Sequence, residues 1–350
     1  MSNFVPGIEL SRAFYGEVVA PLVPGVAHSA ALIGPGSEVL AFDTARSADH
    51  DWGPRVLVFV APEAVAEVRA KVVAGLPARF RGFPTVFGYH GNMQPGVTVT
   101  ELGQWLVERL GFDPRDGVSL LDWLSAPWQS LAEVTRGEVF HDGLDGAVTG
   151  GGLEAARAAL SWYPRDVWRY VLACQWRRIA QEEPFPGRCG EVGDELGSAV
   201  VGARLAREVM RLALLLRRRY PPYAKWLGSA LARMPGSTEL GESLGAALAA
   251  RSWRERQQGL SGAYARVAAL QNRVALAEPV DERVRPFFDR PFEVIGGDRF
   301  AEALMASVSD PTIRDLPVVG CVDQLSDSTD LLMQPGRARP VTAAALGLKA

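Results

Sequence analysis

Apolar and polar residues follow two different periods along this chain, and the change of period divides it. Short apolar or β-branched runs at 28–33, 55–60 and 96–101 have the pattern of strands. From residue 119 onward, apolar residues recur every three to four positions, as in amphipathic helices. We therefore expect an α/β protein, with a small mixed sheet followed by a larger all-helical part.

Two helices are expected beside the strands. Residues 7–22 have apolar side chains at mostly helical spacing, and residues 62–75 begin with a proline and end at Gly75. The residues between this second helix and the last strand, 78–92, are rich in glycine, proline and aromatic residues. We expect them to form an irregular loop. A further short strand is expected at 138–140.

The remaining segments with helical spacing are separated by proline or glycine: 119–135, 153–160, 164–183, 191–219, 222–233, 238–250, 252–276 and 293–308. The glycine-rich stretch 149–152 suits a linker. We therefore place a first domain at 1–150 and a helical domain at 151–335, and we expect 336–350 to be a flexible tail.

Composition narrows the class of protein. With 350 residues, 48% hydrophobic and 22% charged, the chain resembles an ordinary globular protein of about two domains. A net charge of −3 disfavours binding to long duplex nucleic acid. The three cysteines have no Cys-x-x-Cys spacing, which favours a reducing cytoplasm. We expect neither a signal peptide nor a membrane span.

Candidate chemistry gathers around the first two strands. The turn Gly34-Pro35-Gly36-Ser37 offers backbone N–H groups and a hydroxyl, which suit a phosphate chain. Asp49 and Asp51 follow shortly before the second strand. In extended chain, carboxylates at i and i+2 point to the same side and can share one Mg²⁺. Pro54 suits no central strand, so we expect the pair on the lead-in to the strand or on a bulge, with the paired strand itself at 55–60.

This order of a Gly-Ser turn, an Asp-x-Asp pair and a strand resembles the nucleotidyltransferase superfamily that includes DNA polymerase beta. The sequence of 36–43 (GSEVLAFD) and 47–55 (SADHDWGPR) is more similar still to a group of uncharacterised bacterial proteins with a nucleotidyltransferase-like N-terminal part and a helical remainder. The resemblance implies transfer of a nucleoside monophosphate from an NTP to a hydroxyl or similar acceptor, with Mg²⁺ or Mn²⁺. The acceptor is expected to be a small molecule, although a protein side chain or an RNA end stays open, and the ligand is expected between the domains.

The resemblance also implies roles for single residues. Gly36 and Ser37 would hold the phosphates, and Asp49 and Asp51 would bind the metal. A third carboxylate commonly comes from a neighbouring strand, and Glu101, at the end of 96–101, is the best-placed candidate. Alternatively, Glu101 simply opens the next helix, where an acidic residue favours the helix dipole.

Three cations are candidate phosphate ligands: Arg46 and Arg55, which flank the aspartates, and Lys225, which lies among aromatic residues after a helix break. Equally, the two arginines could be ordinary surface residues, and the lysine could extend along an aromatic patch. Glu38 argues against the phosphate site, because its charge would oppose a triphosphate.

Three other functions remain open. A nucleotide-binding regulator, such as a toxin–antitoxin component, would keep the pocket without transferring a nucleotide. A metal phosphohydrolase could use His50-Asp51 and His141-Asp142, but such sites need further histidines on helices, and the four in this chain lie elsewhere. A purely structural helical protein would leave the order of the 30–60 region unexplained.

Overall fold

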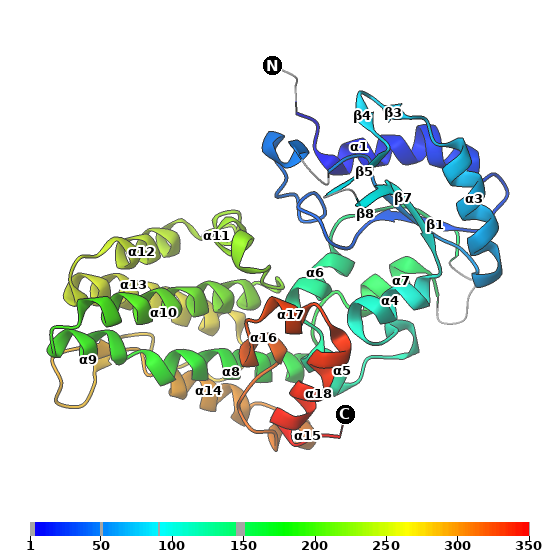
Figure 1. Cartoon of the computed structure of the whole chain (residues 1–350). Coiled ribbons are helices and arrows are strands. Elements are labelled where there is room, and N and C mark those ends of the chain that lie inside the picture. Colours follow the sequence, from blue (N-terminus) through cyan, green and yellow to red (C-terminus); the bar gives the residue numbers. More distant parts are fainter. Residues whose placement is uncertain (1–3, 50–51, 90–91, 145–150, 350) are drawn as a thin grey trace. The chain divides into compact units, whose positions relative to one another are not determined.

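The computed structural model describes residues 4–49, 52–89, 92–144 and 151–349 (Figure 1). The chain forms two compact units. The first comprises Met1–Asp122, Ser130–Ser161 and Met333–Gly336, and the second comprises Trp123–Gln129, Trp162–Leu332 and Arg337–Ala350. The fold is α/β, with a small mixed sheet in the first unit and a larger helical portion, which confirms the predicted class.

The sheet of the first unit has four strands in the order β7-β2-β1-β8. They are β1 Ser29–Leu32, β2 Val56–Phe59, β7 Val97–Thr100 and β8 Glu138–Asp142. β1 is antiparallel to both β2 and β8, whereas β2 and β7 are parallel, with Leu57 opposite Thr98. A parallel pair needs a crossover, and here α3 Val65–Gly75 lies between the two strands in the chain.

One face of this sheet carries the core of the first unit. α1 Gly7–Phe14 continues through the π-helical turn Tyr15–Val19 into α2 Ala20–Leu22, which confirms the predicted helix over 7–22. α3 extends a 3₁₀ turn at Pro62–Ala64, as predicted. Both helices bury apolar side chains against alternate strand residues, in a cluster that includes Leu10, Phe14, Val58, Val68, Val72 and Val99. Each such side chain stabilises the fold by about 1.5–3 kcal/mol.

The segment expected as an irregular loop is instead two small hairpins. β3 Arg79–Phe80 pairs with β4 Phe83–Pro84, and β5 Val86–Tyr89 pairs with β6 Asn92–Pro95. Phe80 is buried against Phe14, with 5.2 Å between ring centroids. Tertiary contacts of aromatic side chains therefore order strands that are too short to show a period of two in the sequence.

The remaining helices of the first unit follow the sheet strands: α4 Leu102–Leu110, the 3₁₀ turn Pro114–Asp116, α5 Leu120–Ser125, α6 Trp128–Thr135 and α7 Leu153–Ala159. The last residues of α5 and the first residues of α6 belong to the second unit. The single helix predicted over 119–135 is thus two helices, because Pro127 separates them.

The second unit is built mainly from helices: α8 Arg165–Glu182, α9 Phe185–Glu191, α10 Glu195–Leu216, α11 Ala224–Ala232, α12 Thr238–Ala249, α13 Trp253–Val274, α14 Gly297–Ala306, α15 Pro311–Arg314, α16 Val322–Leu325, α17 Thr329–Leu332 and α18 Pro335–Leu346, with the short pair β9 Arg285–Pro286 and β10 Glu293–Val294 (Figure 1). α18 begins in the first unit. It covers residues expected as a flexible tail, and it buries Ala338, Thr342 and Leu346, which are four residues apart on one face.

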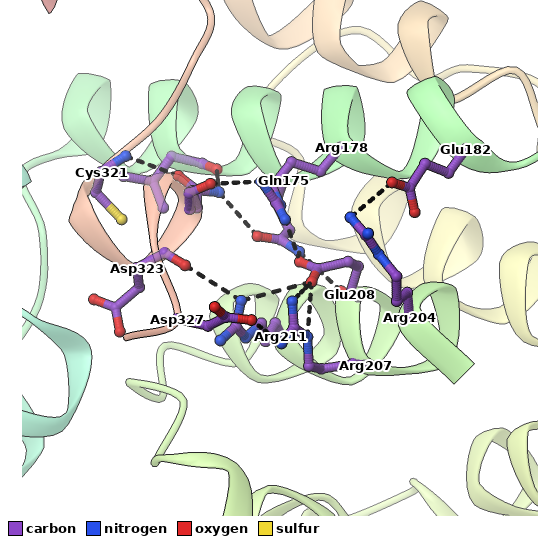
Figure 2. Close-up of polar contacts among 12 residues, drawn as sticks. Gln175, Arg178, Glu182, Arg204, Arg207, Glu208, Arg211, Cys321, Asp323 and Asp327 are labelled. Carbon is purple, nitrogen blue, oxygen red and sulfur yellow. Dashed lines mark hydrogen bonds and ion pairs between the residues drawn. The ribbon is translucent and has the colours of Figure 1, made fainter. Parts of the chain in front are cut away.

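Buried polar side chains join the longest helices of this unit to the C-terminal segment. Figure 2 shows the cluster around Glu208, in which each of four arginines, Arg178, Arg204, Arg207 and Arg211, forms an ion pair with Glu182, Glu208 or Asp327. Arg211 also donates a hydrogen bond of 3.3 Å to the backbone carbonyl of Asp323. Glu208 is buried in α10 and lies within 3.0–3.6 Å of three of these arginines. Burial raises its pKa, but the arginines, Arg211 first, lower it overall. We call this group the Glu208 cluster, and each of its four arginines is ion-paired.

Candidate functional site

The turn after β1 has a conformation that requires glycine. Gly34 and Gly36 have φ angles of +89° and +145°. A Cβ on Gly36 would lie 2.7 Å from a carboxylate oxygen of Glu38, so the position leaves no room for a side chain. The predicted glycine-rich turn is therefore present. Only glycine fits at Gly36, because its backbone lies so close to charged side chains.

Arg55 is bound to this turn. Its guanidinium forms an ion pair with Glu38, which is buried, and donates a hydrogen bond of 2.6 Å to the carbonyl oxygen of Pro35. The Nε–H of Arg55 is buried and has no acceptor among the described residues. The charge of Glu38, which argued against a phosphate here, is thus neutralised by Arg55, and one N–H group stays available to a ligand.

The structure describes the residues on either side of the aspartate pair. Asp49 ends a 3₁₀ helix, Ala45–Asp49, so the extended geometry assumed for the pair does not hold at its first member. The side chain of Asp49 and the whole of Asp51 lie outside the described residues. Arg46 is exposed on the same 3₁₀ helix. After the pair, the Trp52 ring packs edge-on against Phe83 at 5.1 Å, and β2 begins only after Pro54, as predicted.

Glu101 is the N-cap of α4. Its carboxylate accepts hydrogen bonds from the backbone N–H groups of Gly103 at 2.7 Å and Gln104 at 2.5 Å. Arg115 lies 3.7 Å away. This is the geometry expected if Glu101 opens the helix, and it engages both carboxylate oxygens.

A cavity of about 460 Å³ lies beside the turn, within the first unit. The turn contributes Pro35, and β2, β7 and α4 contribute most of the remaining polar lining: Arg55, Thr98, Thr100, Glu108 and Arg109. Glu101 is not among the described residues that line it. Glu108 accepts a hydrogen bond of 2.9 Å from the side chain of Gln104, whereas Arg109 has no ion-pair partner among the described residues.

These lining residues were not predicted from the sequence, although two signals point to them. Alternation along β7 places Thr98 and Thr100 on the face opposite the buried Val97 and Val99. Glu108 and Arg109 follow Trp105 by three and four positions in α4, so all three share one face of the helix. The cavity therefore adds to the predicted Arg55 the guanidinium of Arg109, which no carboxylate of the described residues pairs with.

Lys225 belongs to the second unit, at the start of α11. Its ammonium lies 5.6 Å from the ring centroid of Trp226, and this ring packs edge-on against Tyr223 at 5.1 Å. The side chain is exposed. This contact is the one expected if Lys225 simply extends along an aromatic patch.

The described residues contain no group of three histidine, cysteine, aspartate or glutamate side chains arranged to hold a metal ion. His28 and His141 do lie together, with ring centroids 4.7 Å apart. His28 donates through Nδ1 to the carbonyl of Val26 and accepts through Nε2 from Tyr15, so both ring nitrogens are engaged. Burial lowers the pKa of His28. Asp142 accepts a hydrogen bond of 2.9 Å from the backbone of α7, so the His-Asp pair at 141–142 supplies no open metal site.

Comparison with known proteins gives two similarities. Residues 123–227 match a family described as a domain of unknown function (DUF4037). The chain is also similar to the crystal structure of a nucleotidyltransferase-like protein from Exiguobacterium sibiricum, with 16% sequence identity and a TM-score of 0.33, over 86% of this chain and 89% of the other. No curated protein matches the chain. None of the helices in the described residues is both long enough and apolar enough to cross a membrane.

Proposed function

We propose that this protein is a metal-dependent nucleotidyltransferase, which moves a nucleoside monophosphate from an NTP to a hydroxyl or similar group of a small acceptor. The observation that carries the proposal is the cavity beside the turn at Gly36. Pro35 of the turn, the guanidinium groups of Arg55 and Arg109, and the hydroxyls of two strand threonines line it, and Arg55 also contacts the turn itself. This combination suits a phosphate chain, because guanidinium groups match phosphate geometry and backbone N–H groups bind anions.

Asp49 and Asp51 would hold Mg²⁺ or Mn²⁺, since carboxylates are the hard oxygen donors that these cations prefer. The bound cation would neutralise charge on the triphosphate and orient it. In our proposal Gly36, Ser37, Arg46 and Arg55 bind the β- and γ-phosphates of the donor.

The transfer itself is an in-line displacement at the α-phosphorus. The acceptor oxygen forms a bond to this phosphorus, the bond to the bridging oxygen breaks, and pyrophosphate leaves. The hydroxyl proton passes to Glu101 or to solvent.

The first test measures thermal unfolding with each NTP, with and without Mg²⁺ or Mn²⁺. A ligand at a hundred times its dissociation constant stabilises the protein by about 2.7 kcal/mol. We expect a metal-dependent shift that is lost in Asp49→Asn and in Asp51→Asn and retained in the matched control Asp116→Asn, an exposed aspartate of the same unit. A shift of equal size in all the variants would refute the assignment.

One observation favours a second candidate, a regulator that binds nucleotide without transferring it. The Glu101 carboxylate caps α4, so its oxygens already accept hydrogen bonds from backbone N–H groups. A Glu101→Gln side chain keeps an oxygen for the cap but loses the carboxylate charge and basicity. If Glu101 serves catalysis, label from α-phosphate-labelled NTP will no longer reach any acceptor in this variant, while NTP binding persists. If the wild-type protein binds NTP but never transfers label, the regulator is the better description.

A further inference from the structure

A second cavity, of about 810 Å³, lies in the helical unit where three helix ends meet. Four arginines line it, Arg165, Arg217, Arg218 and Arg273, and we call it the arginine groove. The rest of its lining is aromatic or aliphatic and includes Trp162 and Trp168. It belongs neither to the turn at Gly36 nor to the cavity beside that turn.

The directions of the helices explain why these arginines gather. Near the start of α8, the Trp168 indole N–H donates to the carbonyl of Leu215 at 3.0 Å, and near its end Arg204 pairs with Glu182 at 2.7 Å. α8 is therefore antiparallel to α10. It is also antiparallel to α13, because Arg169 donates to Leu276 at 2.9 Å and Trp176, two turns further along α8, donates to the earlier Gln271 at 3.3 Å. The last residues of α10 and α13 consequently meet the first residues of α8.

The charge of the arginine groove is not balanced. No acidic side chain lines it, and none of its four arginines forms an ion pair with a described residue. The neighbouring carboxylate of Asp166 is already engaged by Arg169 at 2.8 Å and by two backbone N–H groups. In the Glu208 cluster of the same unit, by contrast, each of the four arginines forms an ion pair with a carboxylate (Figure 2). The arginines of the Glu208 cluster are therefore ion-paired, whereas those of the groove have no ion-pair partner among the described residues.

Helix capping accounts for only part of this arrangement. Arg217 and Arg273 lie at helix C-termini, where a cation is favoured by the helix dipole. Arg165, however, is the first residue of α8, where the same dipole disfavours a cation. Arg218 has a φ of +53° at the position after a helix that glycine usually occupies, and its guanidinium lies 4.8 Å from the centroid of the Trp168 ring.

The polar groups of the groove specify the ligand. Guanidinium groups bind phosphate oxygens through two parallel hydrogen bonds, so four of them suit more than one phosphate group. The indole Nε1–H of Trp162 is buried and has no acceptor among the described residues, which provides a further donor. We propose that the arginine groove binds a small molecule carrying a diphosphate group. This proposal is independent of the proposed nucleotidyl transfer.

Titration calorimetry with inorganic pyrophosphate tests the proposal, using the full chain at low salt with EDTA present. Removal of divalent cations separates this site from the metal-dependent site proposed in the first unit. We expect binding with a dissociation constant below about 1 mM, weakened about tenfold or more in Arg217→Gln/Arg273→Gln. Both side chains are exposed, so the variant should fold. The matched control is Arg251→Gln/Arg337→Gln, which removes two exposed arginines of the same unit outside the groove.

Each result decides the proposal. Loss of affinity in the groove variant with retention in the control supports it, and retention in Asp49→Asn separates the groove from the proposed NTP site. If wild type shows no binding at millimolar pyrophosphate, or if both double variants weaken it equally, the proposal is wrong. Tighter binding of ADP than of pyrophosphate, lost in the same variant, would identify the diphosphate as part of a nucleotide; equal binding would identify the diphosphate alone.

Discussion

The carboxyl group of Asp323 gives a quantitative prediction about pH and stability. Asp323 is buried, and it accepts a hydrogen bond of 2.8 Å from the backbone N–H of Trp128. Burial raises its pKa from 3.8 to about 6, against the opposing effects of that hydrogen bond and of Arg211. This rise in pKa corresponds to roughly 3 kcal/mol of free energy.

The sign follows from proton binding. Between the unfolded pKa and the folded pKa, the native state binds more protons at this group than the unfolded state does. The contribution of Asp323 to the free energy of unfolding is therefore greatest below about pH 4 and falls as the pH rises to about 6. The amide of the variant Asp323→Asn would keep an oxygen for the Trp128 N–H group and would not titrate. The stability of this variant relative to wild type should thus rise by about 3 kcal/mol across this range.

Urea denaturation of both proteins, followed by tryptophan fluorescence at several pH values, measures this difference. Asp327→Asn is the matched control, because Arg207 lowers the pKa of Asp327. Its stability relative to wild type should change in the opposite direction, and only slightly, since this side chain is exposed. A difference between Asp323→Asn and wild type that stays constant with pH would refute the reasoning.

Two further predictions follow from buried groups of the helical unit. Burial raises the pKa values of the thiols of Cys174 and Cys321, whereas Cys189 is half-buried. A disulfide reagent should therefore modify Cys189 rapidly in the native protein and the other two cysteines only on unfolding. Rapid reaction of more than one thiol in the native protein would contradict this. Glu183 is buried and accepts hydrogen bonds from three backbone N–H groups at the start of α14, so Glu183→Ala should reduce the free energy of unfolding by at least about 3 kcal/mol. The adjacent Glu182 forms only a surface ion pair, and Glu182→Ala should cost about 1 kcal/mol or less by the same denaturation assay.

The sequence was sufficient for elements whose side chains repeat with a clear period. The helix over 7–22, the strand Val97–Thr100 and the long helices α8, α10 and α13 were predicted within a few residues. α9 was not, because its sequence, FPGRCGE, contains a proline and two glycines that disfavour a helix. Its glycines are explained by contacts distant in the chain. A Cβ on Gly187 would lie 2.5 Å from the Phe292 ring, so the helix packs where only glycine fits.

The candidate site was predicted less completely than the fold, because a side chain's position in the sequence does not fix its direction. Glu101 was expected at the end of a strand and is there, yet its carboxylate binds backbone N–H groups of α4. Arg55 was expected to face phosphate, and it also neutralises Glu38. Both arrangements depend on hydrogen-bond partners that no periodic pattern encodes.

Ion pairing offers a physical criterion for separating structural arginines from binding ones in this protein. An arginine that holds buried carboxylates, as Arg207 holds Glu208, cannot turn to a ligand without leaving a buried charge unpaired, which costs several kcal/mol. An exposed arginine at the wall of a cavity, such as Arg273, holds no buried carboxylate among the described residues. It can therefore donate all its N–H groups to an anion. Arg55 stands between these cases, since it is paired with Glu38 but keeps a free Nε–H. By this criterion Arg109 should contribute more to NTP affinity than Arg55, because no carboxylate of the described residues competes for it.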